Sequence, residues 1–296
     1  MTFQEGGNFD AGRVRKRGPG KGGVAVGGGI GGIAVVALIL ILQATGNSDL
    51  ANVVNQVAGG QGGAGAQAES TLPACTAAQA NSDRDCRLEG TIESLDVYWA
   101  AAVPTQFSQP GVVSFTQAVN TACGNASSAS GPFYCPPDQT IYLDVSFYDD
   151  LESQLGAEDG PLAEMYVTAH EYGHHIQNLT GVMDQADRQG TGADSDSVRT
   201  ELQADCYAGM WVGDATETLD PDTGEPFLEP ITQEQLQNAL GAAAAVGDDH
   251  IQQRGGGDVN PDAFSHDTSE QRERWFTTGY QQGTLEACDT FAADTL

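Results

Sequence analysis

Residues 165–177 read MYVTAHEYGHHIQ and contain the pattern His-Glu-x-x-His. Apolar residues recur at helical spacing over residues 161–179, which predicts a helix. His170 and His174 are four residues apart, so in a helix both imidazoles project from one face. Two imidazoles placed in this way can bind one Zn²⁺, and Glu171 can act as general base on a metal-bound water without being a ligand.

A second pattern supports this interpretation, because His-Glu-x-x-His also occurs by chance in unrelated helices. Residues 199–209 read RTELQADCYAG and also predict a helix, with Glu201 and Asp205 four residues apart. Glu201 as third ligand would give a His₂Glu site with one open position, and Asp205 could accept the spare N–H of a ligand histidine. The alternative is a solvated helix face, which is common in an acidic chain.

The other histidines have weaker contexts. His266 directly precedes a predicted helix start at Thr268 and could hydrogen-bond the oxyanion of the reaction. The alternative is a loop histidine that bonds the local backbone. We expect His175 in packing around the site or on the surface rather than as a ligand, and His250 in a structural role.

The six cysteines all follow residue 70, and their number is even, which indicates disulfides in an exported domain. Six cysteines allow 15 pairings. Pairing close neighbours is the economical choice, and free buried thiols or a nucleophilic Cys206 are the less favoured alternatives. The candidate pairs are Cys75 with Cys86, Cys123 with Cys135, and Cys206 with Cys288.

The charge is large and unevenly distributed. The chain has 12 Lys and Arg against 41 Asp and Glu, a net charge of -29, which argues against nucleic acid as a partner. Residues 1–21 carry 5 basic and 2 acidic groups, a net of +3, and residues 22–70 carry a net of −2. The remainder of the chain therefore carries −30.

An uncharged stretch separates the basic start from the acidic remainder. Residues 22–44 contain no charge and would form a helix of about 34 Å, enough to cross a hydrocarbon core of about 30 Å. We predict a transmembrane helix here, with a cleaved signal peptide as the alternative. The basic residues before it predict a cytoplasmic N-terminus and an exported remainder. Glycine-rich residues 45–70 are expected to form a flexible linker.

The remaining pattern predicts an α+β, mainly helical domain with a small sheet over residues 71–296. We expect strands at 111–115 and 140–146, and an edge strand along the cleft at 139–144. The helices are expected at 88–102, 161–179, 197–212, 232–246 and 268–281.

Several segments from Thr71 to Leu296 together resemble the neutral zinc metallopeptidases of bacterial membrane-anchored proteins, a zincin family. The resemblance rests on CGNASS at 123–128, GPFYCP at 131–136, IYLD at 141–144, and the segments 170–177, 201–209 and 265–272.

The resemblance implies particular roles for the site residues. The spacing Glu201-x-x-x-Asp205 is similar to the gluzincin pattern, with His170, His174 and Glu201 as ligands of one zinc and Asp205 behind a histidine. The resemblance also implies that Glu171 acts as general base and that His266 contacts the oxyanion of the reaction. Asp267 departs from the pattern, since those enzymes usually have proline there.

We therefore expect a membrane-anchored zinc metallopeptidase that hydrolyses peptide bonds outside the cytoplasmic membrane, with a protein or peptide substrate. One alternative is a zinc-binding scaffold domain with weak or no activity at the cell envelope. Another is a hydrolase acting on peptidoglycan peptides.

Overall fold

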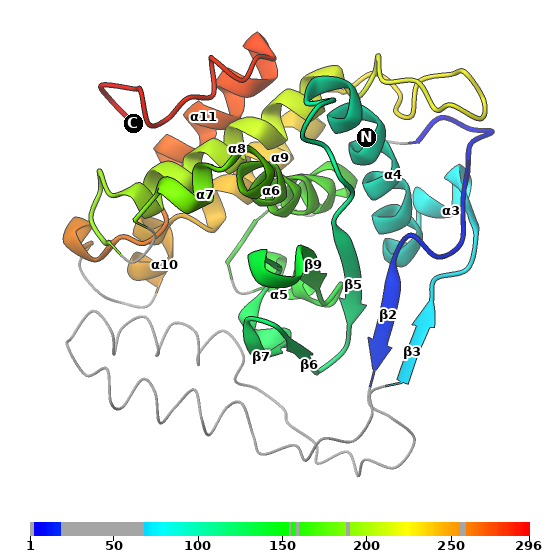
Figure 1. The fold of residues 1–296 in the computed structure, drawn as a ribbon, viewed down its shortest axis with the longest axis horizontal. Helices are drawn as coiled ribbons and strands as arrows, with labels where there is room; N and C mark the ends of the chain where they lie inside the picture. The colour runs from blue at the N-terminus through cyan, green and yellow to red at the C-terminus, as the bar shows by residue number, and fades with distance from the viewer. Residues whose placement is uncertain (1–2, 19–67, 154, 158–159, 188–189, 255–258) are drawn as a thin grey trace.

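The computed structural model describes residues 3–18, 68–153, 155–157, 160–187, 190–254 and 259–296. Helices dominate this part of the chain, and a small sheet lies beside them (Figure 1). The nine α-helices among the described residues are α3 (Ala77–Ala80), α4 (Arg84–Ala102), α5 (Phe147–Ser153), α6 (Pro161–Thr180), α7 (Val182–Gln185), α8 (Asp196–Asp214), α9 (Gln233–Ala245), α10 (Asp248–Arg254) and α11 (Ser269–Gln282).

The five long helices confirm the sequence prediction within a few residues, because local signals fix their ends. Thr232 and Thr268 each accept a hydrogen bond from the backbone N–H three residues on, and a glutamine reaches back in a capping box. Pro161 begins α6, where its missing N–H costs nothing, and Gly181 ends the helix in a left-handed conformation.

The main sheet has five strands in the order β3-β2-β5-β9-β8. Strand β2 is parallel to β5 and antiparallel to β3, while β9 is parallel to β5 and antiparallel to β8. Over all the sheets, the strands among the described residues are β1 (Asn8–Phe9), β2 (Arg15–Gly18), β3 (Ala68–Thr71), β4 (Cys75–Thr76), β5 (Gly111–Phe115), β6 (Ala118–Thr121), β7 (Gly124–Ser127), β8 (Phe133–Cys135) and β9 (Thr140–Leu143).

The predicted edge strand at 139–144 is wrong. Strand β9 lies inside the sheet and has a neighbour on both sides, so its backbone groups are already paired. The edge is β8, which precedes β9 and returns through the short turn Pro136–Asp138. Its three residues were too few to give a periodic signal.

The N-terminal basic segment is not a separate tail, which corrects the prediction for residues 1–21. Arg15–Gly18 form the β2 strand, and Phe3 and Val14 are fully buried. Arg13 forms a bidentate ion pair with the buried Asp96 of α4. The backbone N–H groups of Arg13 and Val14 donate to buried Glu89 of the same helix.

This arrangement has a consequence for topology. Strands β2 and β3 are hydrogen-bonded neighbours, so Arg15–Gly18 and Ala68–Thr71 belong to one sheet. A cytoplasmic N-terminus opposite an exported domain does not agree with that pairing. Among the residues that the structure describes, no helix has the length and hydropathy needed to cross a membrane. The predicted span 22–44 and linker 45–70 lie outside those residues, except for the end of the linker, which begins β3.

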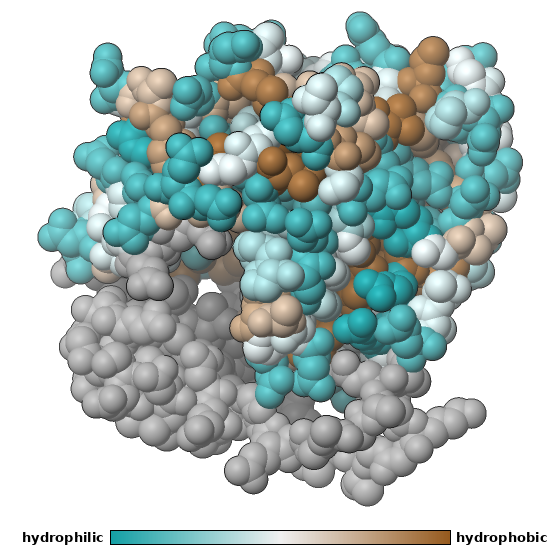
Figure 2. Space-filling model, viewed as in Figure 1, coloured by the Kyte–Doolittle hydropathy of each residue, from teal (hydrophilic) through white to brown (hydrophobic). Residues whose placement is uncertain are grey.

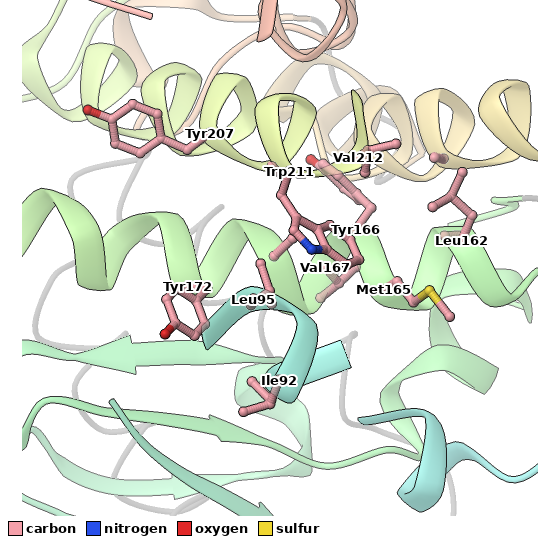
Figure 3. Close-up of a cluster of buried hydrophobic side chains, with 14 of the residues drawn as sticks. Ile92, Leu95, Leu162, Met165, Tyr166, Val167, Tyr172, Tyr207, Trp211 and Val212 are labelled. Carbon is pink, nitrogen blue, oxygen red and sulfur yellow. The ribbon is translucent and has the colours of Figure 1, made fainter. Parts of the chain in front are cut away.

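The core lies where α6 packs between α4 and α8. Figure 3 shows side chains from the three helices meeting there, among them Leu95, Tyr166 and Trp211. The Trp211 indole N–H donates to Ser94 of α4 at 3.1 Å, so the buried polar atom is satisfied. On the face seen in Figure 2 the surface is mainly hydrophilic, with small scattered apolar areas.

Helices α8 and α11 cross so closely that only glycine fits at the contact. A Cβ on Gly279 would lie 1.9 Å from the carbonyl oxygen of Cys206, and a Cβ on Gly209 would lie 2.0 Å from that of Phe276. The two backbones therefore touch directly. Because α8 carries Glu201 and Asp205, this contact holds one wall of the site in place.

Three disulfides complete the fold, in the economical pairing. They join Cys75 to Cys86, Cys123 to Cys135, and Cys206 to Cys288. The third spans 82 residues and ties the C-terminal segment to α8.

We predict that Gly279→Ala lowers the free energy of unfolding by about 3 kcal/mol, the upper end of typical overpacking costs, because the methyl group would overlap the α8 backbone. Denaturant unfolding followed by circular dichroism measures this change. Gly241→Ala in α9 is the matched control, since no atom lies within 4 Å of a Cβ there. The control should raise stability by about 0.5–1 kcal/mol. Equal effects of the two substitutions would contradict the close crossing.

Candidate metal centre

Two helices bring three potential metal ligands together. His170 and His174 lie on one face of α6, and Glu201 faces them from α8. The Nε2 atom of His170 is 3.2 Å from Oε2 of Glu201, and the Nε2 atom of His174 is 3.5 Å from Oε1. One ligand atom from each residue lies within 4.8 Å of the other two.

Glycine at position 173 makes this approach possible. A Cβ there would lie 3.1 Å from both Cα and the carbonyl oxygen of Ala204, so a larger residue would require the α8 backbone to move by a few tenths of an ångström. The glycine stands between the two histidines, and Ala204 stands between Glu201 and Asp205. A close contact of the two helices therefore lies beside the ligand residues.

The other ring nitrogen of each histidine has a buried partner. Nδ1 of His170 is 2.8 Å from Oδ1 of Asp205, and Nδ1 of His174 is 2.8 Å from Oε1 of Gln177. These acceptors favour the tautomers in which Nδ1 carries the proton and Nε2 is free. Both free Nε2 atoms point at Glu201, as a shared metal requires.

Asp205 is the centre of a buried polar network. Arg272 of α11 donates to both of its oxygens, at 2.9 and 3.0 Å, and the Tyr166 hydroxyl donates to Oδ1. The Nε atom of Arg272 also lies 3.4 Å from Asp267, whose carboxylate is completely buried. Burial raises the pKa of Asp267 well above its usual value, while Arg272 and His170 hold the pKa of Asp205 below it.

The charges around the ligands favour a cation between them. Burial lowers the pKa of His170, but Asp205 and Glu201 outweigh it and raise the pKa to about 10. Burial raises the pKa of Glu201, yet the two imidazoles more than offset this and hold it well below its usual value. A divalent metal would supply the positive charge that these groups stabilise.

The donor set fits zinc. Two imidazole nitrogens and one carboxylate oxygen are ligands that Zn²⁺ accepts in tetrahedral geometry, and three protein ligands leave one position open. Glu171 lies beside this group, and burial raises the pKa of its carboxyl while His174 and His170 lower it. A buried carboxylate next to an open metal position can exchange protons with a metal-bound ligand.

A cleft of about 400 Å³ runs over the ligand group. The edge strand β8 forms one wall, through residues 131–134 that begin just before it. The cleft also has an apolar part. Its lining side chains are Phe147, Leu155, Val167, Val246 and Ile251.

His266, predicted at the oxyanion, lines the same cleft. Its side chain is 43% exposed, and its Nδ1 atom lies 3.6 Å from Asp248. Asp248 also accepts the backbone N–H groups of Ser265 and His266, both at 2.8 Å. Partial burial lowers the pKa of His266, but the nearby carboxylates of Asp248 and Glu201 raise it to about 9.

The remaining two histidines lie outside the ligand group. His175 is completely buried and contacts Tyr134 and Ser108. His250 bonds the carbonyl oxygen of Leu155 at 2.9 Å, away from the ligands. Both agree with the sequence interpretation.

Sequence reasoning missed several residues that hold the site, because their partners are distant in the chain. Arg272 and Asp248 gave no local signal, since each acts on another element. Gln177 did carry a signal, because it stands three residues after His174 on the same helix.

We predict that Glu201→Ala lowers zinc affinity by more than about 100-fold, because loss of a group that merely orients a ligand already costs about 10–100-fold. Metal analysis after dialysis and calorimetric titration measure this loss. Glu217→Ala, at an exposed position just beyond the end of α8, is the control and should bind zinc normally. One tightly bound zinc per chain in Glu201→Ala would remove this residue from the ligand set.

Comparison with known proteins agrees with the zinc site that the geometry indicates. Residues 2–291 match the sequence profile of the family described as "Putative neutral zinc metallopeptidase". The chain is 49% identical over 218 residues to Mb2605 of Mycobacterium bovis and to Rv2575 of Mycobacterium tuberculosis, covering 74% of each protein and 74% of this chain. It is 44% identical over 190 residues to YpfJ of Escherichia coli, covering 62% of each.

All three relatives are described as uncharacterized proteins, and no solved structure matches the chain. The profile match extends over nearly the whole sequence, including the N-terminal segment that forms β2. The chain therefore belongs to the zinc metallopeptidase family that this profile defines.

Proposed function

We propose that the protein is a zinc-dependent peptidase that hydrolyses peptide bonds in an extended protein or peptide substrate. The observation that supports this most directly is Glu171, a buried carboxylate next to a three-donor His₂Glu group in an open cleft. Zinc at this group would polarise the scissile carbonyl and lower the pKa of a bound water.

Four side chains of the protein would have the remaining roles in the reaction. Glu171 takes a proton from the attacking water and later delivers it to the leaving amine, as the carbon–oxygen bond forms and the carbon–nitrogen bond breaks. His266, whose backbone N–H donates to Asp248, lines the same cleft and hydrogen-bonds the oxyanion. Asp205 and Gln177 keep the ligand imidazoles in one orientation.

The substrate main chain would add to the sheet at β8. This strand is the free edge beside the cleft, and extended peptides commonly pair with such edges. The apolar part of the cleft would then receive a bulky apolar side chain of the substrate, because Phe147, Leu155 and Ile251 there carry no charge.

A zinc-binding scaffold without turnover is the alternative function. Structural zinc sites are usually closed by four protein ligands, frequently cysteines. Here the ligand group has three members, and all six cysteines form disulfides. The geometry therefore favours catalysis.

Glu171→Gln should keep its zinc and lose about 10²–10⁴-fold in kcat, because glutamine retains the shape of the side chain but accepts no proton. Cleavage of an unstructured protein such as casein, with and without a chelator, measures the activity. Glu234→Gln, an exposed position of α9, should keep full activity. Full activity in Glu171→Gln would exclude this residue as the base, and absence of chelator-sensitive cleavage in the parent would favour the scaffold.

We further propose that the protein acts outside the cytoplasm, on the basis of its three disulfides, which persist in oxidising compartments. Membrane association through residues 22–44 remains part of this proposal. Because Arg15–Gly18 and Ala68–Thr71 pair in one sheet, the segments before and after residues 22–44 would both lie on the exported side.

Cysteines introduced at two exposed positions test this topology in cells. Asn8→Cys and Glu217→Cys should both react with a membrane-impermeant maleimide in intact spheroplasts. The parent should not react, since it has no free thiol among its six cysteines. Labelling at only one of the two positions would mean that the segments lie on opposite sides of the membrane.

A further inference from the structure

Tyr134 connects the edge strand β8 to the metal helix α6 through its side-chain hydroxyl. Tyr134 and Glu171 line the same cleft. The Tyr134 hydroxyl lies 3.0 Å from Nδ1 of His175 and 3.0 Å from Nδ2 of Asn178. His175 and Asn178 are three residues apart on α6, so two neighbouring positions of the helix hold one hydroxyl of the strand.

We propose that Tyr134, locked by His175 and Asn178, is a positioning residue that fixes β8 relative to Glu171 and to the substrate main chain. The inference rests on the proposed peptidase function. It also gives a role to His175, which follows the ligand His174 directly but is no ligand itself.

The direction of each hydrogen bond follows from the partners. Nε2 of His175 lies 2.7 Å from the carbonyl oxygen of Ser108, which can only accept, so Nε2 carries a proton. His175 is completely buried and has no carboxylate partner among its described hydrogen bonds, so the ring is neutral and Nδ1 is an acceptor. The Tyr134 hydroxyl therefore donates to Nδ1 and accepts from the Asn178 amide.

This chain of bonds leaves Tyr134 little freedom. Its side chain is buried and its ring packs edge-on against the His175 imidazole, with centroids 5.4 Å apart. The neighbouring Phe133 stacks on Tyr142 of β9 and so holds the strand within the sheet. Additional fixation comes from the disulfide between Cys135 and Cys123.

Position along α6 determines what this attachment does. Glu171 and His175 are four residues apart, one turn of the helix, so the hydroxyl is anchored one turn beyond the base. The same strand offers its outer edge to the substrate. A displacement of about 1 Å in such a contact can cost about 100-fold in rate, because the reacting groups lose their alignment.

The test compares zinc-loaded full-length parent with Tyr134→Phe, which keeps the ring and removes only the hydroxyl. Two hydroxamates serve as probes: acetohydroxamate, which reaches only the metal, and a peptidyl hydroxamate, which also extends along β8. Calorimetry gives both affinities without requiring turnover. Cleavage of a fluorogenic peptide gives kcat and KM.

We expect Tyr134→Phe to keep its zinc and its affinity for acetohydroxamate. Its affinity for the peptidyl hydroxamate and its kcat/KM should each fall about 10- to 100-fold. Tyr148→Phe is the matched control, since it removes a buried hydroxyl that bonds the Glu164 carbonyl of the same helix, away from β8. That variant should keep both hydroxamate affinities.

A second variant tests the same contact if Tyr134→Phe does not fold. Asn178→Ala removes the donor to the Tyr134 hydroxyl and should weaken peptidyl hydroxamate binding in the same direction, by a smaller factor. The proposal is overturned if Tyr134→Phe binds the peptidyl hydroxamate as the parent does, or if it loses both hydroxamates equally. A parent that binds both probes but cleaves nothing would overturn the proposed function alone.

Discussion

The direct contact of helices α6 and α8 is the constraint on which the site depends. Ligands from two helices can share one metal only if the backbones approach closely, and Gly173 against Ala204 allows this. On its other side α8 is pressed against α11 through Gly209 and Gly279. Helices α6, α8 and α11 thus form one stack, with glycine or alanine where they cross.

Buried charged side chains also link the three helices of this stack. Arg272 reaches from α11 to Asp205 on α8, and Asp205 reaches His170 on α6. Breaking such a network leaves an unpaired charge in the interior, which costs more than the pair itself contributes. A second carboxylate, Asp96 of α4, links the N-terminal Arg13 to Tyr172 of the metal helix. The N-terminal segment is therefore attached to the active-site helix through one buried residue.

Local pattern predicted the long helices well and the sheet only in part. The helix over 161–180 has apolar residues at helical spacing and is bounded by Pro161 and Gly181, and the strand at 111–115 is a short, mostly buried run, so both can be located from neighbouring residues. The β2 strand reads Arg-Lys-Arg-Gly and has no apolar alternation, since its side chains are only partly buried. The basic charge of this N-terminal segment therefore predicts a membrane topology. In the structure, Arg13, just before β2, forms an internal ion pair with Asp96.

The sequence by itself determined the ligand pattern, because residues four apart in a helix meet on one face whatever surrounds them. His170, Glu171 and His174, and the pair Glu201 and Asp205, were predicted in this way. Only the tertiary structure decided what surrounds these groups: the edge strand β8 along the cleft of Glu171, Arg272 behind Asp205, and Asp248 behind His266. Those partners are up to 67 residues apart in the chain, and helix packing rather than local spacing brings them together.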